Sequence, residues 1–379
     1  MNPTSLLGPE SALGAPAPYW VLVFFKVLGF TLHMGPMNLW FAGLPLAMLL
    51  GTFGGAHAKR QSARLLSQMP LIIAAGVNLG IVPLLFLQVA YYRVFYPATI
   101  LEAWAWFFVI AFLCAAYYGT YLYAIALKTG SKVLTRWARL AGWGAAALFV
   151  IIGFIFAHTM SLMTNVGAWD AIFKHTTVAG GVLGIGNNFG DPTLIPRYLL
   201  MIGLALVTCA AYFSLDAALF ASKETAEYKA WVGGFAWKLG LAGVLWFAIF
   251  GSWYTFGTWQ PVVREAMLSG SLLPLTVLTA VSPGLTWLLL LLNRAGTSRP
   301  LALAAVHIQL GVLALNAISR QVVQNRELAP YFSPAAEKVN LQLSPLIVFL
   351  LLFVGGVALL IWMISKAAQA QRQPLPGRK

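Results

Sequence analysis

The chain has 379 residues, of which 60% are hydrophobic and only 9% are charged, and it carries a formal net charge of +14. Soluble domains contain roughly 25% charged residues, and a soluble fold of this length could not bury so much apolar surface. The composition therefore excludes a soluble protein and predicts an all-α, polytopic membrane protein.

Hydropathy and helix-breaking residues predict about nine spans, each of at least the ~18 apolar residues that can cross a bilayer. In chain order they lie near residues 19–51, 69–95, 99–127, 138–164, 194–221, 229–256, 270–293, 301–322 and 342–365. Short inner connections indicate antiparallel neighbours, so we expect residues 1–379 to form one integral membrane domain, a compact helix bundle. Outside the spans we expect an external N-terminal segment at 1–18, an external loop at 166–193 and a basic cytoplasmic tail at 367–379.

Basic residues concentrate in alternate connections, and this pattern predicts the orientation of the bundle. One side receives Lys59, Arg60, Arg64, Lys128, Lys132, Arg136, Arg139, Lys223, Lys229, Arg294, Arg299 and the tail, whereas the other side receives most of the acidic residues. The positive-inside rule then places the N-terminus outside and the C-terminus inside. The charge also favours contact with anionic lipid, and it needs no nucleic-acid partner.

The first span contains an ionisable residue, His33, within the apolar stretch "KVLGFTLHMGPMNLW" at 26–40. A titratable side chain inside a membrane is costly unless it has a partner, so each one is a candidate functional residue. Imidazole is a common ligand of haem iron, and Met37 lies nearby. Gly35-Pro36 should break the helix just after His33 and leave room for a flat macrocycle. A hydrogen bond across helices is the alternative role for His33.

The remaining ionisable candidates are few, and none follows a metal-binding spacing. Glu102 opens the third span, and the others are His158, Asp216, Lys238 and His307 in later spans. There is no HxxxH or ExxH, which disfavours a di-iron or zinc site. Two cysteines, Cys114 and Cys209, lie in spans without a CxxC or CxxCH, so covalently attached haem is excluded.

Three stretches together resemble the first subunit of the cytochrome bd oxidase family. "FTLHMGPMNLWFAGLPLAML" at 30–49 is similar to its first helix, and "GVNLGIVPLLFLQVAYYRVFYPATILEAWAWFF" at 76–108 is similar to its second and third helices. "GSWYTFGTWQPVVREAM" at 251–267 is similar to the end of its sixth helix. The resemblance implies that His33 is an axial haem ligand and that Glu102 is the family's membrane glutamate, which takes part in proton transfer.

The departures from that family are equally specific. No long external quinol-binding loop follows Trp259-Gln260-Pro261, the segment "PRYLLM" contains no histidine, and "LTAVSPGLTWLLLLL" contains no methionine. The family's arginine motif is echoed only by "SRQVV" at 319–323. We therefore expect a pared-down relative that is not a quinol oxidase on its own.

The resemblance leads to an expected set of cofactor contacts. One or two b-type haems are expected, with a haem-free chain as the alternative. His33 is the first candidate for iron, and His158, ranked above His307, is the candidate for a second axial ligand. Three external arginines could pair with haem propionates, since Arg suits carboxylate recognition, and they are Arg197, Arg320 and Arg326. Pairing of external arginines with Glu265 and Glu327 is the alternative.

The leading functional hypothesis is a membrane subunit of a respiratory electron-transfer complex in the bacterial inner membrane. It would pass electrons between the quinol pool and an external c-type cytochrome or other redox partner, with quinone as a further candidate ligand. One alternative is a haem-free scaffold that anchors such a partner. Another is a small-molecule transporter, because "HMGPMN" and "TAVSPGL" are typical of broken transporter helices.

Overall fold

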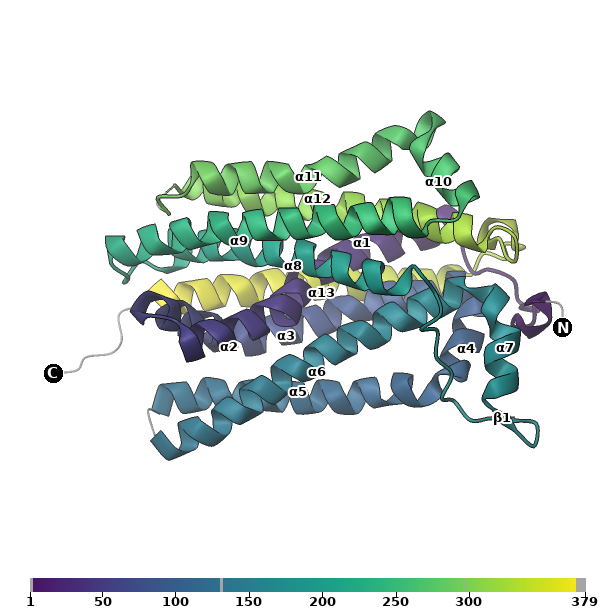
Figure 1. The fold of residues 1–379 in the computed structure, drawn as a ribbon, viewed down its shortest axis with the longest axis horizontal. Coiled ribbons are helices and arrows are strands. Elements are labelled where there is room, and N and C mark those ends of the chain that lie inside the picture. Colours follow the sequence, from purple (N-terminus) through teal and green to yellow (C-terminus); the bar gives the residue numbers. More distant parts are fainter. Residues whose placement is uncertain (1–2, 130–131, 297, 373–379) are drawn as a thin grey trace.

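The computed structural model describes residues 3–129, 132–296 and 298–372, and this part of the chain forms a bundle of long helices that run along a common axis (Figure 1). The first half contains α1 (Tyr19–Asn38), α2 (Leu44–Phe53), α3 (Ala56–Ala90), α4 (Tyr92–Leu101), α5 (Ala103–Thr129), α6 (Lys132–Thr164) and α7 (Trp169–His175). The second half contains α8 (Leu194–Leu215), α9 (Ala226–Ser252), α10 (Pro261–Leu268), α11 (Leu273–Leu292), α12 (Arg299–Leu328) and α13 (Leu343–Arg372). The only paired strands in the described part are β1 (Thr177–Val178) and β2 (Gly181–Val182), which form a small antiparallel hairpin.

The described residues contain nine helices that are long and apolar enough to cross a membrane, which confirms the predicted number of spans and the all-α polytopic fold. The first and last described segments lie at opposite ends of the bundle, as an odd number of spans requires (Figure 1). We name the end that carries α7 and the N-terminus the outer end, following the predicted orientation. Of the predicted basic tail, residues 373–379 lie outside the described residues.

Several boundaries differ from the expected ones. The second span ends at Ala90 and not near 95, and the short helix α4 separates it from the third span, which begins at Ala103 and not near 99. At two other boundaries, polar residues continue the helix beyond its apolar run. The second span begins at Ala56 and not near 69, because α3 includes a basic first part whose Arg64 pairs with Asp216. The eighth span continues to Leu328 and not to 322, because Gln324 and Asn325 have hydrogen-bond partners on neighbouring helices.

The expected helix break at Gly35-Pro36 is wrong. Helix α1 continues through Pro36 to Asn38, and a π-helical turn at Leu39–Gly43 joins it to α2. The first span is therefore one continuous rod, and the irregularity lies after His33 as a widened turn. Such π-helical turns occur often at functional sites.

Helices α1 and α3 approach each other closely through glycines. A Cβ on Gly76 would lie 2.2 Å from the Trp40 ring, and a Cβ on Gly80 would lie 2.8 Å from the His33 ring. Gly76 and Gly80 have the GxxxG spacing that lets membrane helices pack tightly. The glycines of α3 thus provide the surface on which the His33 and Trp40 side chains rest.

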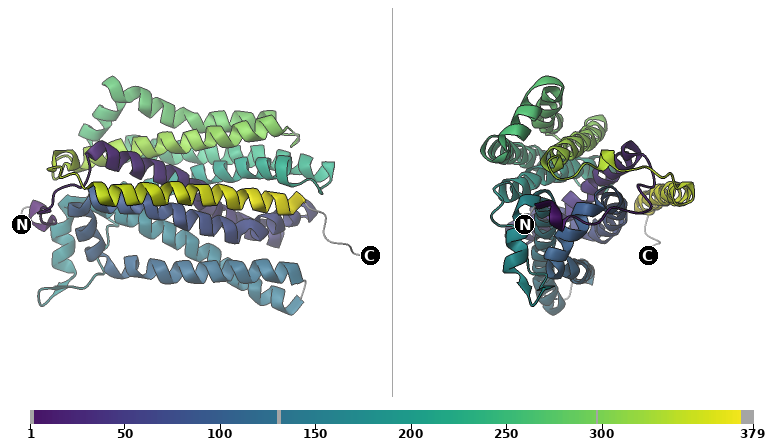
Figure 2. Two further views of the ribbon diagram at one scale, coloured as in Figure 1. Left: turned by 180° about the vertical axis from the view of Figure 1, so that it is seen from behind. Right: turned by 90° about the vertical axis from the view of Figure 1, so that its right-hand side faces the viewer.

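The bundle has a central helix and a peripheral one. The α8 span is 61% buried, whereas no residue of the α13 span is buried. Helix α13 lies on the outside of the bundle (Figure 2) and reaches it through Phe349 and Phe353, which contact Phe25. The core that positions the candidate site is therefore built from α1, α3, α8 and α12.

Candidate cofactor site and two charged clusters

His33 is held between α1 and α3 by a single hydrogen bond. Its Nδ1 lies 2.8 Å from the Gly76 carbonyl oxygen. Because a carbonyl only accepts, Nδ1 must carry the hydrogen, and the neutral ring keeps a lone pair on Nε2. No described residue donates to Nε2. The ring is half-buried, with Trp40 packed edge-on at 5.9 Å between ring centroids. A backbone acceptor on one nitrogen is the usual support for a histidine that binds metal through the other.

The depth of His33 follows from the contacts between α1, α12 and α11. Gly35 lies level with Leu310, because a Cβ on Gly35 would be 3.9 Å from Leu310 Cδ2. One residue earlier on α12, Gln309 accepts a hydrogen bond from Thr286 of α11 at 3.0 Å. Helix α11 has 20 residues and is therefore about 30 Å long, close to the thickness of the hydrocarbon core. His33 thus lies near the middle of the membrane.

His158 occupies a different environment, in which both ring nitrogens are already used. Nδ1 bonds to a Glu102 carboxylate oxygen, and Nε2 accepts the Asn188 backbone N–H at 2.7 Å. Thr159 donates to the other Glu102 oxygen. Glu102 and His158 are 1% and 5% exposed, so the pair is sealed from solvent. The structure leaves His158 no lone pair for iron unless the Asn188 contact breaks.

The His158 contacts instead fix the external loop to the bundle. Asn188 also donates from its side chain to Ser161 at 2.9 Å and to Asp191 at 3.3 Å, and Asp191 accepts the Thr193 N–H at 2.9 Å. Since Ser161 lies one turn after His158 on α6, this helix holds the loop at two points. Through its bond to Nδ1, Glu102 orients the His158 ring toward the Asn188 N–H.

The other predicted ligands lie apart from His33. His307 is exposed on α12, and its Nδ1 bonds at 2.8 Å to the Leu303 carbonyl of its own helix. Met37 is 8% exposed and belongs to the apolar core. No group of three or more His, Cys, Asp or Glu side chains arranged to bind a metal occurs in the part of the chain that the structure describes.

A cluster of three cations lies on the outer side of His33, and we call it the outer cluster: Lys26, Arg197 and Arg320. Lys26 Nζ donates to Gln321 Oε1 at 2.7 Å and to Gln324 Oε1 at 3.1 Å. The Arg320 guanidinium lies 5.0 Å from the Phe30 ring centroid, one turn before His33 on α1. Arg320 is close enough to both other cations to repel them.

The charges of the outer cluster are not balanced. Arg197 pairs with Glu327 at 2.7 Å and is also attracted by Asp191. Within the described residues, however, neither Lys26 nor Arg320 has a carboxylate within ion-pair distance. Gln324 Nε2 and Arg197 Nε are buried donors without a hydrogen-bond partner there. Cations without a carboxylate partner and buried donors without an acceptor are costly inside a membrane bundle, so the outer cluster is suited to an anionic group.

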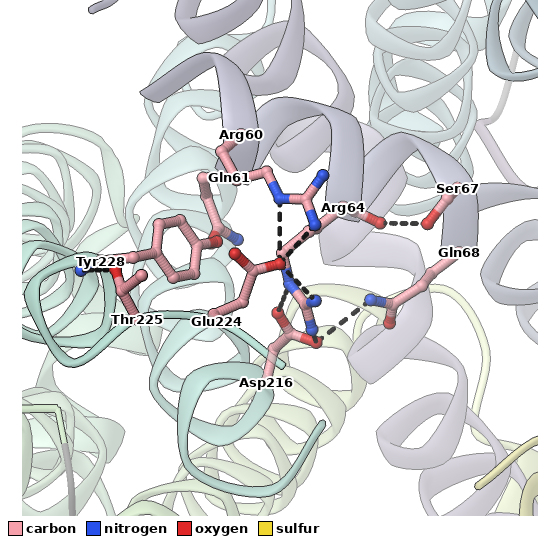
Figure 3. Close-up of polar contacts among 9 residues, drawn as sticks. All are labelled: Arg60, Gln61, Arg64, Ser67, Gln68, Asp216, Glu224, Thr225 and Tyr228. Atoms are coloured by element: carbon pink, nitrogen blue, oxygen red, sulfur yellow. Dashed lines mark hydrogen bonds and ion pairs between the residues drawn. The ribbon is translucent and has the colours of Figure 1, made fainter. Parts of the chain in front are cut away.

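A second charged cluster at the inner end provides the contrast (Figure 3). Arg64 donates two hydrogen bonds of 2.8 Å to the Asp216 carboxylate, and Gln68 donates a third at 3.1 Å. Arg60 donates to Glu224 at 2.6 Å and at 2.9 Å. Two cations therefore meet two carboxylates, and this inner cluster joins α3 to the α8–α9 connection without needing a ligand.

Two further predicted residues have simple positions. Arg326 is exposed and contacts no described partner, so it is not part of the outer cluster. Lys238 is exposed on α9, only five residues beyond Gly233, whose Cα faces the Arg294 carbonyl of an inner loop. Gly233 and Lys238 are about 7.5 Å apart along α9, so the Lys238 side chain can extend to the membrane–water interface at the inner end.

Sequence reasoning named His33, Arg197 and Arg320 but missed Lys26, Gln321 and Gln324. A signal for them exists. Lys26 precedes His33 by seven residues, two helical turns on one face, and α12 carries polar residues at 320, 321, 324 and 325. What the sequence could not supply is that α1 and α12 lie side by side.

No family model matches the chain, and no curated protein matches it.

Proposed function

We propose that the chain is the haem-binding membrane subunit of a bacterial respiratory electron-transfer complex that resembles cytochrome bd oxidase subunit I. The observation that carries the proposal is the pair of unbalanced cations, Lys26 and Arg320, on the outer side of a histidine with a free Nε2. The family resemblance of residues 30–49 points in the same direction.

A b-type haem has a flat apolar body, an iron that accepts a nitrogen lone pair, and two carboxylates. The residues present offer partners for the iron and for the carboxylates. His33 offers Nε2 near mid-membrane, and the outer cluster offers positive charge and the unpartnered Gln324 amide. In the proposed complex His33 ligates the iron, while Lys26 and Arg320 pair with the propionates. Bound haem supplies one-electron transfer.

Neither of the other two histidines considered as ligands lies beside His33 with a nitrogen free for iron. His158 is engaged by Glu102 and Asn188, and His307 faces outward from the bundle. We therefore propose that His33 is the iron ligand that this chain supplies in the conformation described. His307, which is exposed, could bind a haem shared with a neighbouring subunit. An external c-type cytochrome remains the proposed partner, quinone a further candidate ligand, and proton transfer the proposed role of Glu102.

The test is titration of haem into purified protein in detergent, followed by absorbance, for Lys26→Met and Arg320→Met. Each charge-assisted hydrogen bond contributes about 1.5–3 kcal/mol, so each variant should bind haem roughly 10- to 150-fold more weakly. Removing the unbalanced Arg320 charge should leave the haem-free protein as stable as before, or more stable. Lys26→Met also leaves Gln321 Oε1 and Gln324 Oε1 without their donor, so that variant should lose some stability. Lys238→Met, which neutralises an exposed lysine of α9, is the matched control. Unchanged haem affinity in both outer-cluster variants would contradict the proposal.

The haem-free scaffold is a second candidate because one observation favours it. The Gly76 hydrogen bond and the contact with Gly80 explain a histidine at position 33 through helix packing alone. The absorption spectrum separates the two candidates, since a scaffold would show no b-type Soret or alpha band after haem is supplied.

A further inference from the structure

The external loop contains a segment whose outward face is largely apolar: Leu183, Ile185 and Phe189 are exposed there, and Asn187 is the one polar residue among these four outward positions. From Leu183 to Phe189 the side chains alternate between buried and exposed positions, as in an extended strand. Leu183 and Ile185 point outward with 43% and 58% of their surface exposed, whereas Gly184 and Gly186 face the bundle. In a loop surrounded by water the outward positions would carry polar residues.

The hairpin before this segment continues the same surface. Thr177 pairs with Val182 and Val178 with Gly181, and the turn residues Ala179 and Gly180 both have positive φ, 50° and 81°. Val178 is 64% exposed near the tip of the hairpin. We call the three outward side chains Val178, Leu183 and Ile185 the apolar edge. No charged residue occurs between His175 and Asp191.

Two backbone hydrogen bonds fix the level of the apolar edge at the outer end of α5. Trp104 N–H donates to the Gly184 carbonyl at 3.1 Å, and Gly186 N–H donates to the Leu101 carbonyl at 2.7 Å. The hairpin lies beyond the outer end of α5, at the edge of the bundle (Figure 1, Figure 2). A segment at this edge and at this level of a membrane bundle lies beside the bilayer surface.

We propose that the apolar edge rests in the outer leaflet of the bilayer and anchors the external loop to lipid. The apolar edge is continuous with side chains of α5 that already face lipid, Trp104 and Phe107, which are 56% and 66% exposed. Tryptophan prefers the membrane–water interface, so Trp104 marks the depth at which the apolar edge lies. A soluble redox partner would be recognised through charge, which this segment lacks.

The test uses the full chain reconstituted in phosphatidylcholine and phosphatidylglycerol vesicles, with a nitroxide label at one position at a time. Val178→Cys and Ile185→Cys are labelled in a Cys114→Ala background, in which the remaining cysteine, Cys209, is buried. Lys174→Cys, on the exposed and charged end of α7, is the matched control. Collision with molecular oxygen reports lipid, and collision with a nickel chelate reports water.

The labels at 178 and 185 should collide more with oxygen than with the nickel chelate, and the label at 174 should show the reverse order. The same order at all three positions, with the nickel chelate favoured, would place the apolar edge in water and overturn the proposal. Protection of 178 and 185 from both reagents would also overturn it, because a protein and not lipid would then cover the apolar edge.

Discussion

Replacing Gly80 by alanine tests whether the packing of α3 fixes the position of His33. The new Cβ would lie 2.8 Å from both Cε1 and Nδ1 of His33, whereas ordinary contact begins at 3.4 Å. The ring must withdraw by about half an ångström, which lengthens its bond to Gly76. Overpacking of this kind costs about 1–3 kcal/mol, and alanine in a helix recovers about 1 kcal/mol. We expect a net loss of up to ~2 kcal/mol.

The measurement is the free energy of unfolding in mixed detergent micelles, with the haem difference spectrum as the second readout. Gly311→Ala is the matched control, because a Cβ there meets nothing within 4 Å and should stabilise α12 by up to ~1 kcal/mol. Gly80→Ala should therefore unfold more easily than Gly311→Ala and should show an altered haem band. A Gly80→Ala variant as stable as Gly311→Ala, with an unaltered spectrum, would refute this explanation of how His33 is positioned.

Two predictions concern the inner cluster. Arg64→Met leaves Asp216, which is 1% exposed, with only the Gln68 hydrogen bond. The free energy of unfolding should therefore fall by about 3–5 kcal/mol. A fall of less than about 1 kcal/mol would show that the pair is solvated. Burial raises the pKa of Glu224, but Arg60 and Arg64 outweigh it and hold that pKa below the ordinary 4.5. The stabilisation by Glu224 is therefore present above pH 4.5 and is lost as the pH falls through the lowered pKa. Glu224→Gln should make the midpoint of thermal unfolding depend less on pH in the acid range. An unchanged pH dependence in that range would contradict the role given to Glu224.

The spans were predictable because apolar runs of bilayer length leave few alternatives. Their ends were less predictable, since the basic first part of α3 is stabilised by Asp216, which lies directly after α8 and accepts hydrogen bonds from Arg64. The break expected at Pro36 failed for a different reason. A proline removes one hydrogen bond from a helix, and here α1 tolerates that loss and continues into a π-helical turn that begins three residues later, at Leu39.

The candidate site was predictable in part. His33 and Arg320 could be singled out because each is ionisable within or beside an apolar run. Lys26 was missed because a lysine near a span end is ordinarily solvated, and its importance depends on a contact with Gln321, which is 295 residues away in the chain. His158 shows the converse. Its position in a span suggested a ligand, but the Asn188 backbone that occupies its Nε2 belongs to a loop whose path no local pattern predicts.

We propose that His33 binds haem iron through Nε2, the nitrogen left free when Nδ1 bonds to Gly76. The most direct measurement is the reduced-minus-oxidised absorption spectrum of the haem-supplied protein, compared between wild type and His33→Ala. The wild type should show b-type Soret and alpha bands, and His33→Ala should lose them while its circular dichroism stays helical. Bands of equal height in both proteins, or none in the wild type, would contradict the claim.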